Sequence, residues 1–148
     1  MTAEIKSYPV ASAQAFCASR ESADARRLYG APFVTAPSIH ALAATDVGTA
    51  DAGRPAESIV GALVYTLCGG VAEIESIAID AAHPDAGDAL VRRFEEAASY
   101  NNCHKLVARV KQAGAEQTLL ERLRFRVTAV LERHFFQAHF VDMVKWIA

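Results

Sequence analysis

The pattern of apolar and polar residues changes from that of a strand to that of a helix within one stretch, Val71–Phe94. Its first ten residues contain an apolar run without a breaker and predict a buried strand. A turn is expected at His83, Pro84 and Asp85, and a helix is expected to open at Gly87-Asp88-Ala89. The apolar positions of this helix share one face, and they are Leu90, Val91, Phe94, Ala97 and Ala98.

Before this stretch, the pattern predicts three strands and one helix. They are strand Glu4–Val10, a helix from an N-cap at Ser12 to about Leu28, strand Ser38–Thr45 and strand Glu57–Leu67. The turn-forming residues of Asp46–Pro55 predict an exposed hairpin loop. Gly69-Gly70 predicts a tight hairpin that leads into the central strand.

After the long helix, the chain is expected to form a second helix and three more strands. The elements are a C-terminal cap at Asn101-Asn102, strand Lys105–Val110, helix Ala115–Arg124, and two strands within Arg126–Ile147 that are split near Gln137-Ala138. A strand–helix–strand crossover of this size predicts two parallel neighbours. The fold class is therefore α/β, a mixed sheet of about seven strands with a central parallel pair and flanking helices.

Composition narrows the class of protein. A chain of 148 residues, with 52% hydrophobic and 22% charged residues, predicts one globular domain over residues 1–148. The formal net charge of −2 gives no support to a nucleic-acid partner. No uninterrupted apolar run reaches the roughly 18 residues of a membrane span. Three widely spaced cysteines without a CxxC pattern, and a start without a signal peptide, predict reduced thiols in a cytoplasmic protein without a metal site.

The stretch Val71–Phe94 also predicts a binding site for an anion. A strand, a Gly-containing turn and a helix start present free backbone N–H groups together with the positive end of the helix dipole. Two carboxylates, Glu73 and Glu75, lie on the strand that leads into this turn. A carboxylate beside an anion site suits the transfer of a group from a phosphate-bearing cofactor.

This stretch resembles the GCN5-related N-acetyltransferase (GNAT) superfamily. Ala72-Glu73-Ile74 and Ala78-Ile79 are similar to the fourth strand of its histone-acetylating branch. Residues 84–89 occupy the place of its Q/R-x-x-G-x-G/A loop, which binds the pyrophosphate of acetyl-coenzyme A. Gly87 and Ala89 fit the last two signature positions, whereas Pro84 replaces Gln or Arg and has no N–H to donate.

A second segment is similar to the same family. Residues 119–125 resemble its L-Y-E-K-L-G-F segment, with Leu120 at the Tyr position and Arg124 at the Gly position. The usual general acid is that Tyr, so Leu120 leaves the acid unassigned. Either the thiolate leaves without a dedicated acid, or the protein is a noncatalytic relative that binds an acyl-coenzyme A or a protein partner.

The resemblance implies an acetyl-coenzyme A-dependent N-acetyltransferase that acts on a primary amine of a small molecule or a peptide. Glu73 matches the general base, and Glu75 is the alternative base or a ligand of the acceptor amine. The backbone of Ile77 would lie near the thioester carbonyl and that of Ile79 near the pantetheine arm. The cofactor-binding residues implied are Ile77, Ala78, Ile79, Gly87, Asp88, Ala89 and Leu90.

Several alternatives stay open on the residues alone. Glu73 could be a solvated strand residue paired with a cation. His83 could contact a phosphate or shuttle protons, or it could be a surface turn histidine. Tyr29 and Phe33 are candidates for the wall of the acceptor site, or ordinary core aromatics. The aromatic cluster around Phe135-Phe136 predicts core packing or the interface of a homodimer, and Trp146 predicts core packing. An unrelated α/β ligand-binding module is a further interpretation, which a different strand order would favour.

Overall fold

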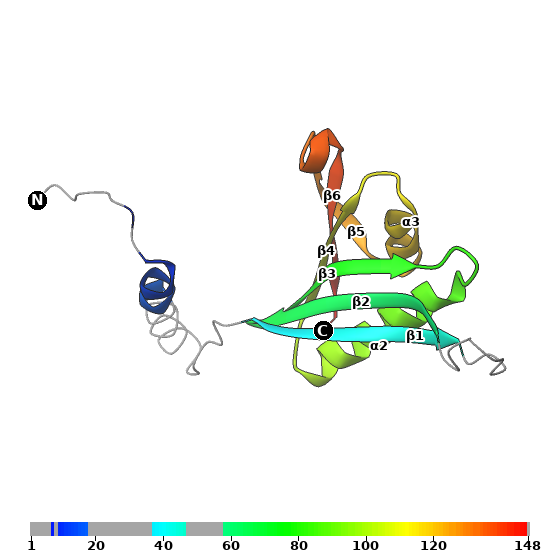
Figure 1. The fold of residues 1–148 in the computed structure, drawn as a ribbon, viewed down its shortest axis with the longest axis horizontal. Coiled ribbons are helices and arrows are strands. Elements are labelled where there is room, and N and C mark those ends of the chain that lie inside the picture. The colour runs from blue at the N-terminus through cyan, green and yellow to red at the C-terminus, as the bar shows by residue number, and fades with distance from the viewer. Residues whose placement is uncertain (1–6, 8, 18–36, 47–57, 148) are drawn as a thin grey trace, which may run out of the picture. The chain divides into compact units, whose positions relative to one another are not determined.

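The computed structural model describes residues 7, 9–17, 37–46 and 58–147, in two units, Met1–Pro37 and Ser38–Ala148 (Figure 1). In the first unit, residues 10–17 form a helix. The Ala13 N–H donates to the Pro9 carbonyl oxygen at 3.1 Å, so the helix begins directly after Pro9, and Ser12 is not its N-cap. Proline suits a helix start because its φ is fixed near the helical value.

The predicted first strand, Glu4–Val10, is not formed where the structure describes it. Ser7 and Pro9 are not in a strand, and Val10 is helical. The other residues of this predicted strand, and the predicted helix from residue 18 to Leu28, lie outside the described residues.

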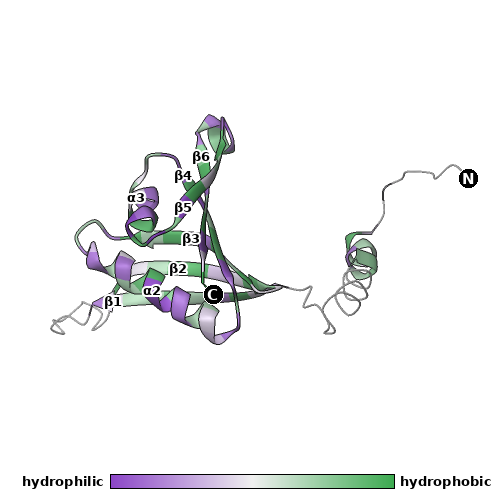
Figure 2. Ribbon diagram, turned by 180° about the vertical axis from the view of Figure 1, so that it is seen from behind, coloured by the Kyte–Doolittle hydropathy of each residue, from purple (hydrophilic) through white to green (hydrophobic). Residues whose placement is uncertain are grey.

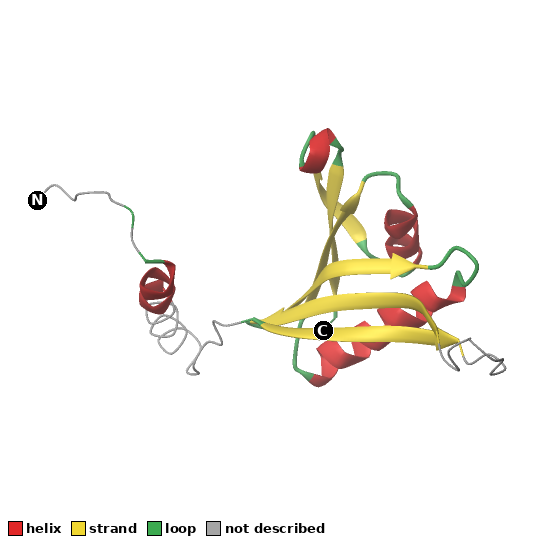
Figure 3. Ribbon diagram, in the orientation of Figure 1, coloured by secondary structure: helices red, strands yellow, loops and turns green. Residues whose placement is uncertain are grey.

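The second unit contains a mixed sheet whose described strands have the order β1-β2-β3-β4-β6-β5. Figure 1 labels these strands, and Figure 3 shows all strands in yellow. The strands are β1 Ser38–Asp46, β2 Ser58–Cys68, β3 Val71–Ile79, β4 Lys105–Lys111, β5 Arg126–Leu131 and β6 Phe140–Trp146. The helices are α2 Asp85–Tyr100, α3 Ala115–Arg122 and the short 3-10 helix η1 Phe135–Gln137. The α/β class and the central parallel pair, β3 and β4, are confirmed. The described sheet has six strands, slightly fewer than the seven predicted.

One hydrophobic core joins both helices to the sheet. Helix α2 packs on β1, β2 and β3, and α3 packs beside β4. The large side chains that are fully buried in this core are Leu63, Val91, Phe94, Leu106, Leu120, Val141 and Met143. Figure 2 shows both hydrophobic and hydrophilic residues on α2, as expected of a helix with one buried face.

Helix α2 begins at Asp85, two residues before the predicted start, because Pro84 already has helical backbone angles (φ −61, ψ −26) at the N-cap. Its C-terminal cap is the one predicted. Asn102 has a positive φ of 59, its N–H donates to Ser99 at 3.0 Å, and the Cys103 N–H donates to Ala98 at 2.9 Å. These two bonds form a Schellman motif, which Asn tolerates well.

Helix α3 ends in the same motif with a less suitable residue. The Arg124 N–H donates to Glu121 at 3.0 Å and the Phe125 N–H donates to Leu120 at 2.9 Å. Arg124 has a φ of 72, in the left-handed region that favours glycine. The predicted helix end at Arg124 is therefore wrong by two residues, because Leu123 and Arg124 form the cap.

Strand β3 contains a bulge that the sequence analysis did not predict. Ile74 pairs with Tyr65 of β2 and Ser76 pairs with Val64, so Glu75 is the extra residue. Ala72 and Ile74 face the core before the bulge, and Ile77 and Ile79 pack against the same core after it. Without the extra residue, the two later isoleucines would face the opposite side of the sheet.

The aromatic residues near the C-terminus are not core residues. Trp146 is 56% exposed and stacks on His104, with the Lys105 ammonium 5.2 Å from its ring centroid. In η1, Phe135 is half-exposed and Phe136 is fully exposed. The prediction of core packing is therefore wrong for Trp146 and for Phe135-Phe136. The prediction that the Phe135-Phe136 cluster forms a dimer interface stays a prediction. In the described part of the chain, no helix has the length and apolar character needed to cross a membrane.

Candidate active site

The two parallel strands separate partway along their length. Strands β3 and β4 pair only from Val71 with Lys105 to Ile74 with Ala108. Beyond this point, residues 75–79 of β3 pair only with β2, and residues 109–111 of β4 pair only with β6. Figure 1 shows the β4–β6–β5 arm turning away from the layer of β1, β2 and β3. We call this opening the fork; it leaves backbone N–H and C=O groups on its inner sides without a strand partner.

A depression of about 410 Å³, here called the fork depression, lies at the open end of the fork. Its lining comes from the end of β3, the start of α2 and the helix α3: Ile79, Asp80, Ala81, Pro84, Gly87, Ala115, Glu116, Thr118, Leu119 and Arg122. It brings together two predicted cofactor-binding residues, Ile79 and Gly87. Ile77 lies two residues earlier on β3, inside the fork. Ala78 instead lines a separate depression of about 280 Å³ beside β2.

Gly87 serves close packing at the start of α2. A Cβ at this position would lie 2.9 Å from Leu119 Cδ2 and 3.4 Å from Ile79 Cγ1. The absence of a side chain at Gly87 therefore lets α2 pack closely against α3 and against the end of β3. Leu90 is buried, so only its backbone is available to a ligand.

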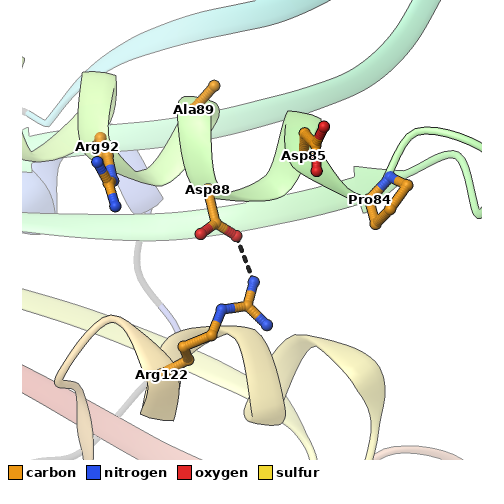
Figure 4. Close-up of a pocket in the computed structure, with 6 residues that line it drawn as sticks. All are labelled: Pro84, Asp85, Asp88, Ala89, Arg92 and Arg122. Atoms are coloured by element: carbon orange, nitrogen blue, oxygen red, sulfur yellow. Dashed lines mark hydrogen bonds and ion pairs between the residues drawn. The ribbon is translucent and has the colours of Figure 1, made fainter.

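A second depression of about 640 Å³ lies beside the first and is called here the arginine depression. It is lined by Pro84, Asp85, Asp88, Ala89, Arg92 and Arg122 (Figure 4). Two more predicted cofactor-binding residues, Asp88 and Ala89, lie here. Asp88 forms an ion pair with Arg122 of α3.

The start of α2 offers fewer anion-binding groups than the sequence predicts. The Ala86 N–H donates to the His83 carbonyl oxygen at 3.1 Å, and the Gly87 N–H donates to that of Pro84 at 3.3 Å. Asp85 and Asp88 add two negative charges to the first turn, where they already complement the helix dipole. Positive charge at this site therefore comes from side chains rather than from the backbone alone.

Glu73 lies one residue before Ile74, the last residue of β3 that pairs with β4. Because its neighbours Ala72 and Ile74 face the core, its side chain is on the opposite face of the sheet. A depression of about 270 Å³ lies there, with a lining of Glu73, Lys105, Val107, Ala108, Arg109, Thr128, Asp142, Met143 and Val144. Glu75 lies nearby, with its Oε1 accepting a hydrogen bond from Thr66 Oγ1 at 3.3 Å.

The surroundings of Glu73 make its carboxyl group a weaker acid. Partial desolvation is the main cause of its raised pKa, followed by the negative charge of Glu75, and Asp142 adds to the shift. Arg109 opposes the shift. Its guanidinium donates to both Asp142 oxygens, from Nε at 2.7 Å and from Nη2 at 3.2 Å, which raises the pKa of Arg109. A carboxylate with a raised pKa is suited to accept a proton near neutral pH.

Three charged residues of these sites did not emerge from the sequence: Arg109, Asp142 and Arg122. Arg109 and Asp142 are cross-strand partners of β4 and β6, and strands so distant in sequence could be aligned only with the sheet order known. Arg122 lies in the second segment that resembles the family. Its ion-pair partner Asp88 belongs to another helix, so this pair could not be recognised without the packing of α2 and α3.

Other predicted residues have different positions. Leu120 is fully buried in the core, so its position offers no proton donor. His83 Nε2 lies 3.2 Å from Asp46 Oδ2 and connects the turn to β1. Tyr29 and Phe33 lie outside the described residues. Among the residues that the structure describes, no group of three His, Cys, Asp or Glu side chains is arranged to bind a metal ion.

Solved structures with a similar fold are acetyltransferases. An acetyltransferase from Bacillus cereus ATCC 14579 matches with a TM-score of 0.69 at 13% identity, over 98% of both chains. A putative GNAT-family acetyltransferase from Desulfovibrio desulfuricans has a TM-score of 0.60 at 18% identity, over 74% of this chain and 70% of its own. The NatC complex bound to Gag peptide and CoA has a TM-score of 0.58 at 14% identity, over 73% of this chain and 71% of its own.

No protein-family model matches the sequence, and no curated protein matches it. The structural likenesses show that the chain has the fold of the GCN5-related N-acetyltransferases. The interpretation as an unrelated α/β module is therefore wrong for the fold.

Proposed function

We propose that this protein is an N-acetyltransferase that uses acetyl-coenzyme A as the donor and a primary amine as the acceptor. The observation that carries the proposal is the position of Glu73 immediately before the fork. A carboxylate with a raised pKa there stands next to strand edges whose N–H groups are free to meet a thioester. The base and the donor site would then lie on one strand, β3.

The chemistry follows from that arrangement. Glu73 accepts a proton from the acceptor ammonium, directly or through a water molecule, so that the amine becomes a nucleophile. The amine nitrogen forms a bond to the acetyl carbonyl carbon, and backbone N–H groups of Ile77 or Ile79 would stabilise the negative charge that develops on the oxygen. The carbon–sulfur bond then breaks, the nitrogen loses its second proton, and the thiolate takes up a proton from solvent.

The two depressions beside the fork are suited to different parts of the donor. The lining of the fork depression includes apolar side chains such as Ile79 and Leu119, which suits the pantetheine arm. The arginine depression holds the charged groups Arg92 and Arg122, which suit the pyrophosphate. Asp85 and Asp88 oppose this second role.

A second candidate is a noncatalytic protein that binds an acyl-coenzyme A without transferring the acyl group. The observation in its favour is that Leu120, at the position where the resemblance places the acid, is fully buried. In this case Glu73 would be a sheet residue without a proton to accept.

Titration calorimetry followed by a transfer assay separates the two candidates. The titrants are acetyl-coenzyme A, coenzyme A and buffer alone, and the assay measures thiol release with a panel of amines, amino acids and peptides. Binding with acceptor-dependent thiol release supports the enzyme. Binding without release for any acceptor supports the noncatalytic candidate, and absence of binding contradicts both.

A further inference from the structure

Arg122 connects the two depressions at the start of α2. It is the last residue of α3, and it lines both the fork depression and the arginine depression. Its guanidinium forms an ion pair with Asp88 of α2, and the two side chains are 56% and 33% exposed. Figure 4 shows Arg122 reaching from α3 toward α2, with Asp88 and Arg92 extending toward it from successive turns.

The start of α2 offers few groups that would bind a phosphate. Pro84 has no N–H, and the N–H groups of Ala86 and Gly87 donate to turn carbonyl oxygens. The acidic residues Asp85 and Asp88 repel an anion. Arginine is the side chain best suited to compensate, because its planar guanidinium donates two parallel hydrogen bonds to a phosphate.

On the basis of the proposed function, we propose that Arg122 binds the pyrophosphate of the donor by exchanging its partner Asp88 for a phosphate. In the free protein, Asp88 holds the guanidinium at the mouth of both depressions. When the donor binds, the guanidinium turns to the phosphate oxygens and the Asp88 carboxylate is released to solvent. An exposed ion pair contributes little to stability, so breaking it opposes binding only weakly.

This exchange differs from simple repulsion between Asp88 and the phosphates. If Asp88 only repels, Asp88→Asn tightens binding by the same factor whether or not Arg122 is present. If Asp88 competes with the phosphate for Arg122, the gain depends on Arg122. A double-mutant cycle measures this difference directly.

The test compares wild type with Asp88→Asn, Arg122→Gln and the double variant, using calorimetry with coenzyme A and with pantetheine, which lacks the pyrophosphate. Arg93→Gln is the matched control, because Arg93 is on α2 beside Arg92 but pairs with Glu96 and lines neither depression. Thermal unfolding and pantetheine binding verify that each variant keeps the folded site.

Arg122→Gln is expected to weaken coenzyme A binding by roughly tenfold to a hundredfold, the contribution of a hydrogen bond to a charged group, and to weaken pantetheine binding much less. Asp88→Asn is expected to tighten coenzyme A binding, and to tighten it much less when Arg122 is already replaced by Gln. Equal tightening by Asp88→Asn in both backgrounds overturns the exchange in favour of repulsion. Unchanged coenzyme A affinity in Arg122→Gln overturns the role of Arg122, and absence of binding by wild type overturns the proposed function itself.

Discussion

Ile74 of β3 and Ala108 of β4 are the last residues at which the two parallel strands pair. Glu73 precedes Ile74 and its side chain is on the face away from the core. The Glu73 carboxylate therefore lies where the fork begins, because the pairing of β3 with β4 ends at the next residue. The bulge at Glu75 follows at once and returns Ile77 and Ile79 to the core side.

The first prediction concerns the charge next to Glu73. Arg109→Gln is expected to raise the pKa of Glu73 further, because Arg109 lowers it and Asp142, then left unpaired, raises it. An NMR titration of the Glu73 carboxyl group measures the shift. If Glu73 is the base, the transfer rate should also decrease as the pH is lowered, and this decrease should occur at a higher pH in Arg109→Gln than in wild type. Arg93→Gln, on α2, should leave both unchanged; an unchanged or lower Glu73 midpoint in Arg109→Gln would refute this electrostatic account.

The same carboxylate should reduce the stability of the folded protein. The folded-state pKa of Glu73 is raised above its ordinary value of 4.5, so ionising it costs more in the folded than in the unfolded state. Glu73→Gln should therefore be more stable than wild type at pH 7, and the difference should disappear as the pH falls below 4.5. Urea denaturation at several pH values measures this. A variant that is less stable at pH 7 would contradict the prediction.

The cap of α3 offers a stabilising substitution. Arg124→Gly should increase the free energy of unfolding by about 0.5–1 kcal/mol, because glycine adopts the left-handed conformation without the strain that arginine carries. Asn102→Gly, at the equivalent position of α2, is the control and should gain less, since Asn already tolerates this region. Denaturation measures both, and a loss of stability in Arg124→Gly would show that its side chain makes a more important contact.

The packing role of Gly87 predicts a loss of stability without any ligand. Gly87→Val places atoms where Leu119 and Ile79 already lie and should cost about 1–3 kcal/mol. Ala89→Val, at an exposed position two residues later in the same helix, controls for the lower helix propensity of valine and should cost under about 1 kcal/mol. Equal costs in the two variants would mean that the neighbours of Gly87 move aside freely.

The sequence predicted those parts of the fold that depend on local patterns. The apolar face of α2, the cap at Asn101-Asn102 and the hairpin at Gly69-Gly70 follow from residues close together in the chain. The bulge was missed although its signal is present in the sequence. The core-facing positions of β3 are the even-numbered Ala72 and Ile74 before the bulge and the odd-numbered Ile77 and Ile79 after it.

The candidate site was less predictable because it depends on contacts between distant segments. Glu73 could be selected from its motif, but Arg109 and Asp142 lie 33 positions apart in the chain and meet only because β6 is inserted between β4 and β5. The pair of Asp88 and Arg122 likewise needs the packing of α2 against α3. Sequence spacing alone carries no information on such pairs.

The central claim is that Glu73 is the base of an acetyl transfer, and single-turnover transfer rates of Glu73→Gln and Glu75→Gln test it most directly. With an acceptor from the amine panel, Glu73→Gln should lower the rate by about 10²–10⁴ while donor affinity stays unchanged. The loss should shrink as the pH rises, because more of the acceptor amine is then already neutral. Glu75→Gln should keep most of the rate. A wild-type rate in Glu73→Gln, or a loss confined to Glu75→Gln, would contradict the claim.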